Sequence, residues 1–367
     1  MPDHVPSAMR SLFSWSSEKT VHPSLILGSG LGIGIPMIIS GWLGMIGVGG
    51  IISIGSLAIA NLSDESPIRE QYSTMLFAFV DDAIAFLFGS LVGNNSVIAG
   101  FSLVVLTLFI TLVGGMNRTF ARCSSLILIF LIVGSSFHSG DLVSSAGITG
   151  FFVIGEIWIV VLMMCLSLLF ARFEPERCVP QTTKTTVKPG SSSLTRQYRY
   201  WKKNLHTLKG WVFTLRITIC MIVAEMTSIL LNLPRAYWIA LVVVLVVHRN
   251  LETTMSRISM RALCTCIGVV IASALMLWSV PSGLFILLIT VLASVRPYAK
   301  SRNYLVYTSV MTILIISLLE FNEPYIQGII MDRLVNTLIG LFIASILGYA
   351  VWQLPFIQKS IKTSMKC

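Results

Sequence analysis

Four acidic side chains fall inside long apolar runs of the sequence: Asp81, Asp82, Glu156 and Glu225. An ionised carboxylate in hydrocarbon costs several kcal/mol, so acids at this depth are usually functional or paired. Asp81 and Asp82 are adjacent, and two neighbouring acids in a low-dielectric medium repel each other when both are ionised. We therefore predict that these four residues couple the protein to protons. For the aspartate pair, the alternative is a buried polar contact to a neighbouring helix.

Arginines form a second candidate group. Arg216 lies about two turns inside an apolar run, whereas Arg257, Arg261 and Arg302 lie at the ends of such runs. Arg257 and Arg261 are four residues apart, so they share one helix face. Because guanidinium groups bind carboxylates through charge-assisted hydrogen bonds, this group predicts a binding site for an organic anion. The alternatives are anchoring of helix ends on the cytoplasmic side and, for Arg216, snorkelling to the surface.

Two aromatic residues, Tyr237 and Trp238, begin an apolar run just after Pro234. Rings at such a position are typical of a helix end anchored at the level of the lipid headgroups. We also include both among the candidate substrate-binding residues.

The elements that must position these side chains are membrane helices. Of 367 residues, 55% are hydrophobic and only 11% are charged, and the mean hydropathy is +0.83. Such a chain is too apolar for a water-soluble globule, so the bilayer is its solvent. The net charge of +10 resides in short segments between apolar runs. It therefore indicates orientation and contact with an anionic leaflet, and we expect no nucleic acid partner.

The apolar runs predict an all-α integral membrane protein with about twelve transmembrane helices. The runs fall into two groups of six, which we interpret as two parallel six-helix repeats, because an even number of spans returns the chain to the same side. The turn before the third run, 65–69, resembles the turn before the ninth, 252–257. The predicted runs are 25–40, 45–62, 72–92, 97–113, 124–133, 146–170, 211–231, 238–247, 262–280, 284–295, 304–319 and 334–352.

Domain boundaries follow from the same pattern. We predict a cytoplasmic N-terminal tail at 1–23, the first repeat at 24–171, a cytoplasmic polar linker at 172–209, the second repeat at 210–353, and a cytoplasmic C-terminal tail at 354–367. With both termini inside, 23 of the 26 Lys and Arg residues fall on the cytoplasmic side. That distribution agrees with the positive-inside rule, and we predict a multi-pass protein of the cell inner membrane without a removable signal peptide.

Glycines are concentrated in the first two apolar runs. The pairs Gly28/Gly32 and Gly30/Gly34 have the four-residue spacing that lets helix backbones approach closely in lipid. Tight packing is one interpretation. The other, given Pro36 in the same run, is a bent helix lining a substrate route.

Enzyme and cofactor chemistry find no support in the sequence. The five histidines lack metal-ligand spacing, and the glycine clusters lack the Lys-Ser/Thr of a phosphate-binding loop. The seven cysteines lie mostly in apolar runs, and Cys264 and Cys266 point to different helix faces. We expect no metal, no cofactor and no catalytic residue.

A family resemblance extends from Pro234 to Gly340. It rests on Pro-Arg-Ala-Tyr-Trp at 234–238, the arginines four apart, Ser-Arg-Asn-Tyr at 301–304 and Arg-Leu-Val-Asn-Thr-Leu-Ile-Gly at 333–340. This pattern resembles the fusaric acid resistance and aromatic acid exporter family. The family often has Gly-Thr where this chain has Cys264-Thr265, and Asp-Thr where it has Asn336-Thr337. Longer relatives also have a soluble domain at the position of the polar linker.

The resemblance implies an exporter of small, aromatic or other organic carboxylate anions, driven by the proton-motive force. Its expected partners are the organic anion, the lipid bilayer and a second copy in a homodimer. Plant malate channels resemble the same family in their six-helix unit, so one alternative is a passive organic-anion channel. A membrane scaffold without a substrate is another.

Overall fold

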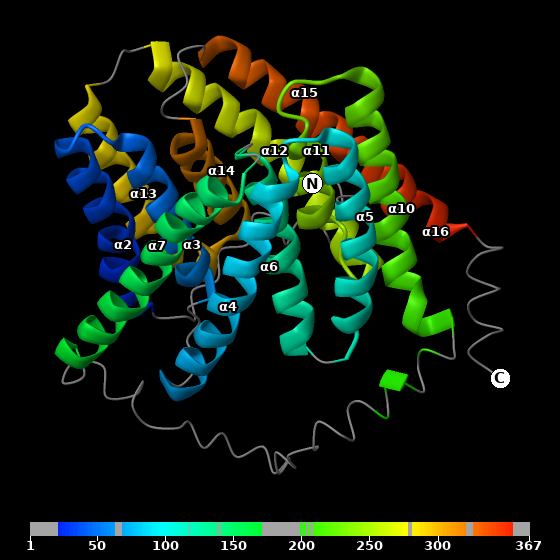
Figure 1. Ribbon diagram of the computed structural model, residues 1–367, viewed down its shortest axis with the longest axis horizontal. Helices are drawn as coiled ribbons and strands as arrows, with labels where there is room; N and C mark the ends of the chain where they lie inside the picture. Colours follow the sequence, from blue (N-terminus) through cyan, green and yellow to red (C-terminus); the bar gives the residue numbers. More distant parts are fainter. Residues whose placement is uncertain are drawn as a thin grey trace, which may run out of the picture. The chain divides into compact units, whose positions relative to one another are not determined.

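The computed structural model is all-helical over the residues it describes, which are 21–62, 68–116, 118–137, 139, 141–170, 199, 201–202, 205, 208–277, 281–320 and 326–354. Figure 1 shows the arrangement of its helices. They are α2 (Pro23–Trp42), α3 (Ile46–Leu62), α4 (Ile68–Val92), α5 (Ser96–Val113), α6 (Arg118–Ser135), α7 (Leu142–Leu169), α10 (Leu208–Leu231), α11 (Tyr237–Val246), α12 (Leu251–Leu277), α13 (Ser282–Arg302), α14 (Tyr304–Glu320), α15 (Ile326–Ser345), the π-helix η1 (Ile346–Ala350) and α16 (Val351–Gln353).

Over the described residues, each of the twelve predicted apolar runs coincides with a helix, α2 to α7 in the first half and α10 to α15 with η1 and α16 in the second. Among the described residues, seven helices are long and apolar enough to cross a membrane, and four further apolar helices are shorter. The prediction of a multi-pass helical membrane protein is confirmed at this level. Nearly all of the predicted tails and of the polar linker lies outside the described residues.

Large apolar side chains cover much of the outside of these helices. Trp42 is 93% exposed, Val143 81% and Leu230 75%. In water such a surface would cost free energy roughly in proportion to its apolar area, whereas in a bilayer it is the expected outer face.

The chain packs as two compact units, and each combines helices from both predicted halves. Unit 1 comprises Met1–Val80, Ala146–Gln181 and Met260–Leu334, and unit 2 comprises Asp81–Ser145, Thr182–Ser259 and Val335–Cys367. Helices α4, α7, α12 and α15 contribute residues to both units.

Unit 1 is assembled around α2, which packs against α3 and α13 (Figure 1). Added Cβ atoms at Gly30 and Gly34 would clash with side chains of α13, and added Cβ atoms at Gly28 and Gly32 would clash with side chains of α7. The predicted glycine pairs therefore do allow close helix approach, one pair on each of two faces of α2. The core beside them consists of Leu25, Ile59, Ala60, Met75, Ala78, Ile159 and Met163.

The contact between α3 and α7 is closer still, because backbone meets backbone. A Cβ added at Gly155 would clash with the carbonyl of Ile52, and one at Gly55 would clash with the carbonyl of Phe152. Ser56 donates a hydrogen bond from Oγ to the Gly155 carbonyl at 2.9 Å across the same contact. Small residues and an interhelical hydrogen bond are the usual means of joining helices in lipid.

Unit 2 surrounds α11, which packs against α6 and α10, while α5 packs against α6 and α10. Eight of the ten residues of α11 are buried. At about 1.5 Å per residue, α11 is roughly 15 Å long, half the thickness of the hydrocarbon core. A helix this short in a membrane protein must be enclosed by protein, because its backbone ends have no water to bind.

The α3–α7 contact yields a prediction about stability. We expect Gly155→Ala to destabilise the protein by about 1–3 kcal/mol, because the new methyl group meets a backbone carbonyl that cannot rotate away. Gly147→Ala on the same helix is the matched control, since nothing lies within 4 Å of its Cβ position. That change should be neutral or stabilise by about 0.5–1 kcal/mol. Thermal unfolding of the purified protein in detergent measures both, and equal melting temperatures for the two variants would contradict the tight contact.

Candidate functional site

The chain leaves helical geometry where α11 ends. Val247 is extended, with φ −71° and ψ 114°, and the next helix begins only at Leu251. A helix end leaves carbonyl groups without intrahelical donors. In a membrane protein, side chains must supply those donors wherever water does not reach.

Two arginines and a threonine supply the donors. Arg216 of α10 donates from Nη2 to the His248 carbonyl, and Arg257 of α12 donates from Nη1 to the Leu245 carbonyl at 3.3 Å. Thr254 donates from Oγ1 to the His248 carbonyl at 3.1 Å and accepts from the His248 N–H at 3.0 Å. Two predicted substrate-binding arginines therefore also hold the turn between α11 and α12.

Arg249 lies in the turn itself and is exposed. Its Nη2 donates to the Thr111 carbonyl at the end of α5, at 3.3 Å. Its guanidinium lies 4.7 Å from the ring centroid of Phe213, and that of Arg216 lies 5.6 Å from the same ring. We call Arg216, His248, Arg249 and Arg257 the turn cluster.

The turn cluster lowers the pKa of its histidine, His248. Burial lowers the pKa of His248 below its ordinary value of 6.5, and the positive charges of Arg257, Arg216 and Arg249 lower it further. His248 is therefore neutral at physiological pH, and the cationic character of the turn comes from its arginines.

The other end of α11 is held by α15. Asn336, 1% exposed, donates from Nδ2 to the carbonyls of Pro234 at 2.8 Å and Arg235 at 3.2 Å. Arg235 has a positive φ of 51°, as expected for a tight turn. An ionised aspartate, which the family often has at this position, could accept hydrogen bonds but could not donate these two.

Two aromatic candidates lie at the start of α11, and one of them, Trp238, differs from the prediction. Trp238 is 1% exposed, so it packs inside the protein and does not face the headgroups. Its ring lies 5.1 Å from that of Tyr237, which is half-buried. The expectation of a headgroup anchor is wrong for Trp238, because neighbouring helices enclose α11 on most sides.

Three of the candidate acids lie in unit 2. Asp82 of α4 is fully buried, at 0% exposure, and neither of its carboxylate oxygens has a hydrogen-bond partner among the described residues. Asp81 is half-buried. Glu225 of α10 lies at the contact with α5, where a Cβ added at Gly100 would lie 3.0 Å from its Oε2.

Unit 1 contains the remaining candidates. Glu156 is fully buried on α7, next to the glycine of the α3–α7 contact. Arg261 of α12 is 9% exposed, and the guanidinium of Arg302, at the end of α13, lies 5.5 Å from the Tyr298 ring centroid. The structure thus brings Arg216 and Arg257 together around one turn and assigns Arg261 and Arg302 to the other unit.

Two arginines with notable surroundings stand outside the predicted site residues, Arg249 and Arg296. Arg296 of α13 is 2% exposed. In the sequence, both arginines lie near the ends of apolar runs on the predicted cytoplasmic side. Hydropathy alone does not distinguish them from arginines that only anchor a helix end. One local signal marks Arg296, because Pro297 follows it inside the helix and interrupts the backbone hydrogen bonding there.

Metal chemistry has no visible basis in the described part of the chain, where no group of three or more His, Cys, Asp or Glu residues is placed to hold an ion. The cysteines that the structure describes are free thiols.

Comparison with known proteins supports the resemblance in the second half. Residues 219–347 match the family described as fusaric acid resistance protein-like. The chain is also 33% identical over 150 residues to the uncharacterized protein YhfK of Escherichia coli (strain K12), an alignment that covers 40% of this chain and 21% of that protein. The chain thus spans about a fifth of the length of this relative. No solved structure matches the chain.

The turn before α11 yields a second prediction. We expect Asn336→Asp to destabilise the protein by about 1–3 kcal/mol. The variant lacks the two hydrogen bonds that the Asn336 amide donates, and its ionised carboxylate would face the two carbonyl oxygens that accept them. Asn336→Ala loses the same donors without adding a charge, so its loss should be smaller. Thermal unfolding at neutral pH compares the three proteins. If Asn336→Asp were as stable as the wild type, the hydrogen bonds from Asn336 would not stabilise the turn before α11.

The turn cluster yields a third prediction, on pH. The unfolded chain takes up a proton at His248 near pH 6.5, whereas the folded protein does so only at lower pH. The unfolded state therefore binds more protons, and stability is lost as the pH falls below 6.5. We expect His248→Gln to lose less stability than the wild type between pH 7.5 and 5.5. Melting temperatures at both pH values measure this, and equal losses would mean that His248 titrates normally.

Proposed function

We propose that this protein exports small organic carboxylate anions, aromatic acids among them, across the cell inner membrane in exchange for protons. The proposal builds on a multi-pass helical protein with a segment, 219–347, that resembles the fusaric acid resistance family. Export requires a place that attracts the anion and a group that takes up and releases the proton. Unit 2 contains a candidate for each.

The observation that carries the proposal is the environment of Asp82. A fully buried carboxylate without hydrogen-bond donors among the described residues is stable only when it holds a proton. It can ionise only when water or a counter-ion reaches it, which is the requirement for alternating proton uptake and release. Asp81, the residue before it, is half-buried and therefore more accessible to water. We propose that a proton passes between water and Asp82 through the Asp81 carboxyl group.

The turn cluster is the proposed point of anion entry. Arg249 is exposed and its guanidinium lies 4.7 Å from the Phe213 ring centroid, so we expect a carboxylate to bind this guanidinium while the aromatic ring of the substrate packs near Phe213. The predicted topology places this turn on the cytoplasmic side. Arg216 and Arg257 keep the turn in place and add to the positive potential that draws an anion in.

Glu225 has a distinctive position in this scheme. In unit 2, the first and second halves of the sequence meet where α5 packs against α10, and Glu225 lies at that contact. A substrate route between the two six-helix halves would pass this carboxylate. We therefore retain Glu225 as a second proton-coupling candidate.

The helix contacts support the proposed repeat. In unit 1, α2 packs on α3 and α13, and α14 packs on α13 and α3. In unit 2, α10 packs on α11 and α5, and α6 packs on α5 and α11. Counting helices from the start of each half, both patterns join the first and second helix of one half to the fourth and fifth of the other. Two parallel six-helix repeats that exchange helix pairs would produce this equivalence.

Two alternatives remain of interest. A passive organic-anion channel would use the same cations but would have no need of a buried, unpaired Asp82. A membrane scaffold would explain the packing but would leave the exposed cation of the turn without a role. The homodimer and the cytoplasmic position of both termini stay predictions.

Transport in proteoliposomes tests the proposal. In liposomes with an acidic lumen, the exit of protons should drive the wild type to take up benzoate against its concentration gradient. Liposomes with the pH gradient reversed are the control. We expect Asp82→Asn to abolish pH-driven accumulation while benzoate exchange at equal pH persists. Asp81→Asn, at the less buried neighbour, should reduce the rate less.

The same assay separates the alternatives. A channel would equilibrate benzoate without concentrating it, and a scaffold would not transport any member of a panel of aromatic and aliphatic acids. Unchanged pH-driven accumulation in the Asp82→Asn variant would remove the coupling role of this residue.

A further inference from the structure

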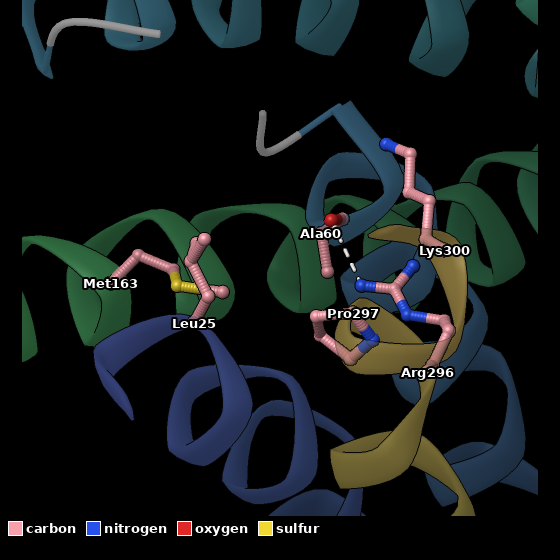
Figure 2. Close-up of a pocket in the computed structure, with 6 residues that line it drawn as sticks. All are labelled: Leu25, Ala60, Met163, Arg296, Pro297 and Lys300. Atoms are coloured by element: carbon pink, nitrogen blue, oxygen red, sulfur yellow. Dashed lines mark hydrogen bonds between the residues drawn. The ribbon is translucent and has the colours of Figure 1, made fainter. Parts of the chain in front are cut away.

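Unit 1 encloses a cation that none of the predicted roles uses. Arg296 of α13 is 2% exposed. Its Nη2 donates to Ser29 Oγ of α2 at 2.8 Å and to the Ala60 carbonyl near the end of α3 at 2.9 Å. Figure 2 shows the guanidinium reaching toward Ala60, with Lys300 beside it on the same helix.

The charge of Arg296 is not compensated by these contacts. Both acceptors are neutral oxygens, and Nε and Nη1 have no hydrogen-bond partner among the described residues. The C-terminal end of α3 offers only the partial negative charge of a helix dipole. Burying an ion without a counter-ion is strongly unfavourable, so two unused N–H donors at this depth indicate a missing partner.

A small cavity opens beside the guanidinium. It is lined by Leu25, Ala60, Met163, Arg296, Pro297 and Lys300, and its volume is about 10 Å³, roughly the space that one water molecule needs. Lys300, one turn further along α13, donates from Nζ to the Asn61 carbonyl at 2.8 Å. Arg296 and Lys300 are the two basic residues among those that line this chamber, and the other lining residues are apolar (Figure 2).

The chamber owes its shape to Pro297. A proline inside a helix lacks the N–H that would bond one turn back, and its ring displaces the helix at that point. Pro297 itself lines the cavity, and Arg296 directly precedes it. The interruption therefore places the space next to the guanidinium.

We propose that this chamber is a binding site for one small monovalent anion, either chloride or the carboxylate group of an organic acid. The anion replaces the water that fits the cavity, accepts hydrogen bonds from the two unused donors of Arg296, and neutralises a charge that the surrounding oxygens leave uncompensated. Lys300 raises the affinity through its charge. The site belongs to unit 1 and stands whether or not the protein exports acids.

Binding to the full-length chain in lipid nanodiscs tests this site. Radiolabelled chloride and radiolabelled benzoate are measured separately by equilibrium dialysis, and each is then competed with the unlabelled other. We expect a saturable site for at least one of them, and mutual competition if the carboxylate group uses the same chamber. Arg296→Gln should weaken the binding at least tenfold, because it removes the charge and the donors.

Two further variants test whether a loss of binding comes from the chamber itself, and not from a general change in charge. Ala60→Val fills the cavity and keeps every charge, so it should also weaken binding at least tenfold. Lys202→Gln removes an exposed positive charge in unit 2 and should leave binding unchanged. Size-exclusion profiles check that each variant is folded.

Thermal unfolding supplies an independent readout. The wild-type melting temperature should rise as chloride is added, and the melting temperature of Arg296→Gln should rise less because that variant lacks the site. Absence of saturable binding to the wild type, or binding by Arg296→Gln or Ala60→Val as tight as that of the wild type, would overturn the proposal and leave the chamber as a site for water alone. A failed benzoate export assay would not alter either outcome.

Discussion

Helices that end inside a membrane protein leave backbone carbonyls that must find donors, and this constraint governs the structure. The protein meets it with arginine side chains. Arg216 binds the His248 carbonyl after α11, and Arg257 binds the Leu245 carbonyl in the last turn of α11. Arg296 binds a carbonyl near the end of α3. Each cation is also favoured there by the helix dipole. As a result, the positive charges that could recognise an anion are held rigidly, at positions where the low dielectric strengthens their action.

The second organising feature is the exchange of helix pairs between the two halves. In unit 1, the glycine face of α2 meets α13 from the second half. In unit 2, α10 meets α5 from the first half, with Glu225 at the contact. In unit 1 the residues that meet at this contact are glycines, Ser294 and Thr290, and in unit 2 they are Gly100 and Glu225. Close backbone approach and isolated charges therefore occur in the same regions, as expected where a membrane protein carries function.

Sequence alone predicted the lipid-embedded helices, because hydropathy directly reports which segments avoid water. The spacing of Gly28, Gly30, Gly32 and Gly34 also predicted close packing correctly, since four-residue spacing fixes a helix face. Periodicity could not identify which helices would be neighbours. For that reason the burial of Trp238 and the enclosure of Arg296 were missed, and the isolation of Asp82 from donors became visible only with its neighbours in place.

The length of chain between partner helices has a consequence for biosynthesis. Ser29 and the arginine that it binds are 267 residues apart, an interval that takes on the order of tens of seconds to translate. During that time the face of α2 that carries Gly30 and Gly34 resides in the bilayer without α13, so lipid or an insertion chaperone must occupy that face. A nascent chain stopped after the first six helices lacks the α13 side chains that pack on Gly30 and Gly34, so that face of α2 stays open to lipid.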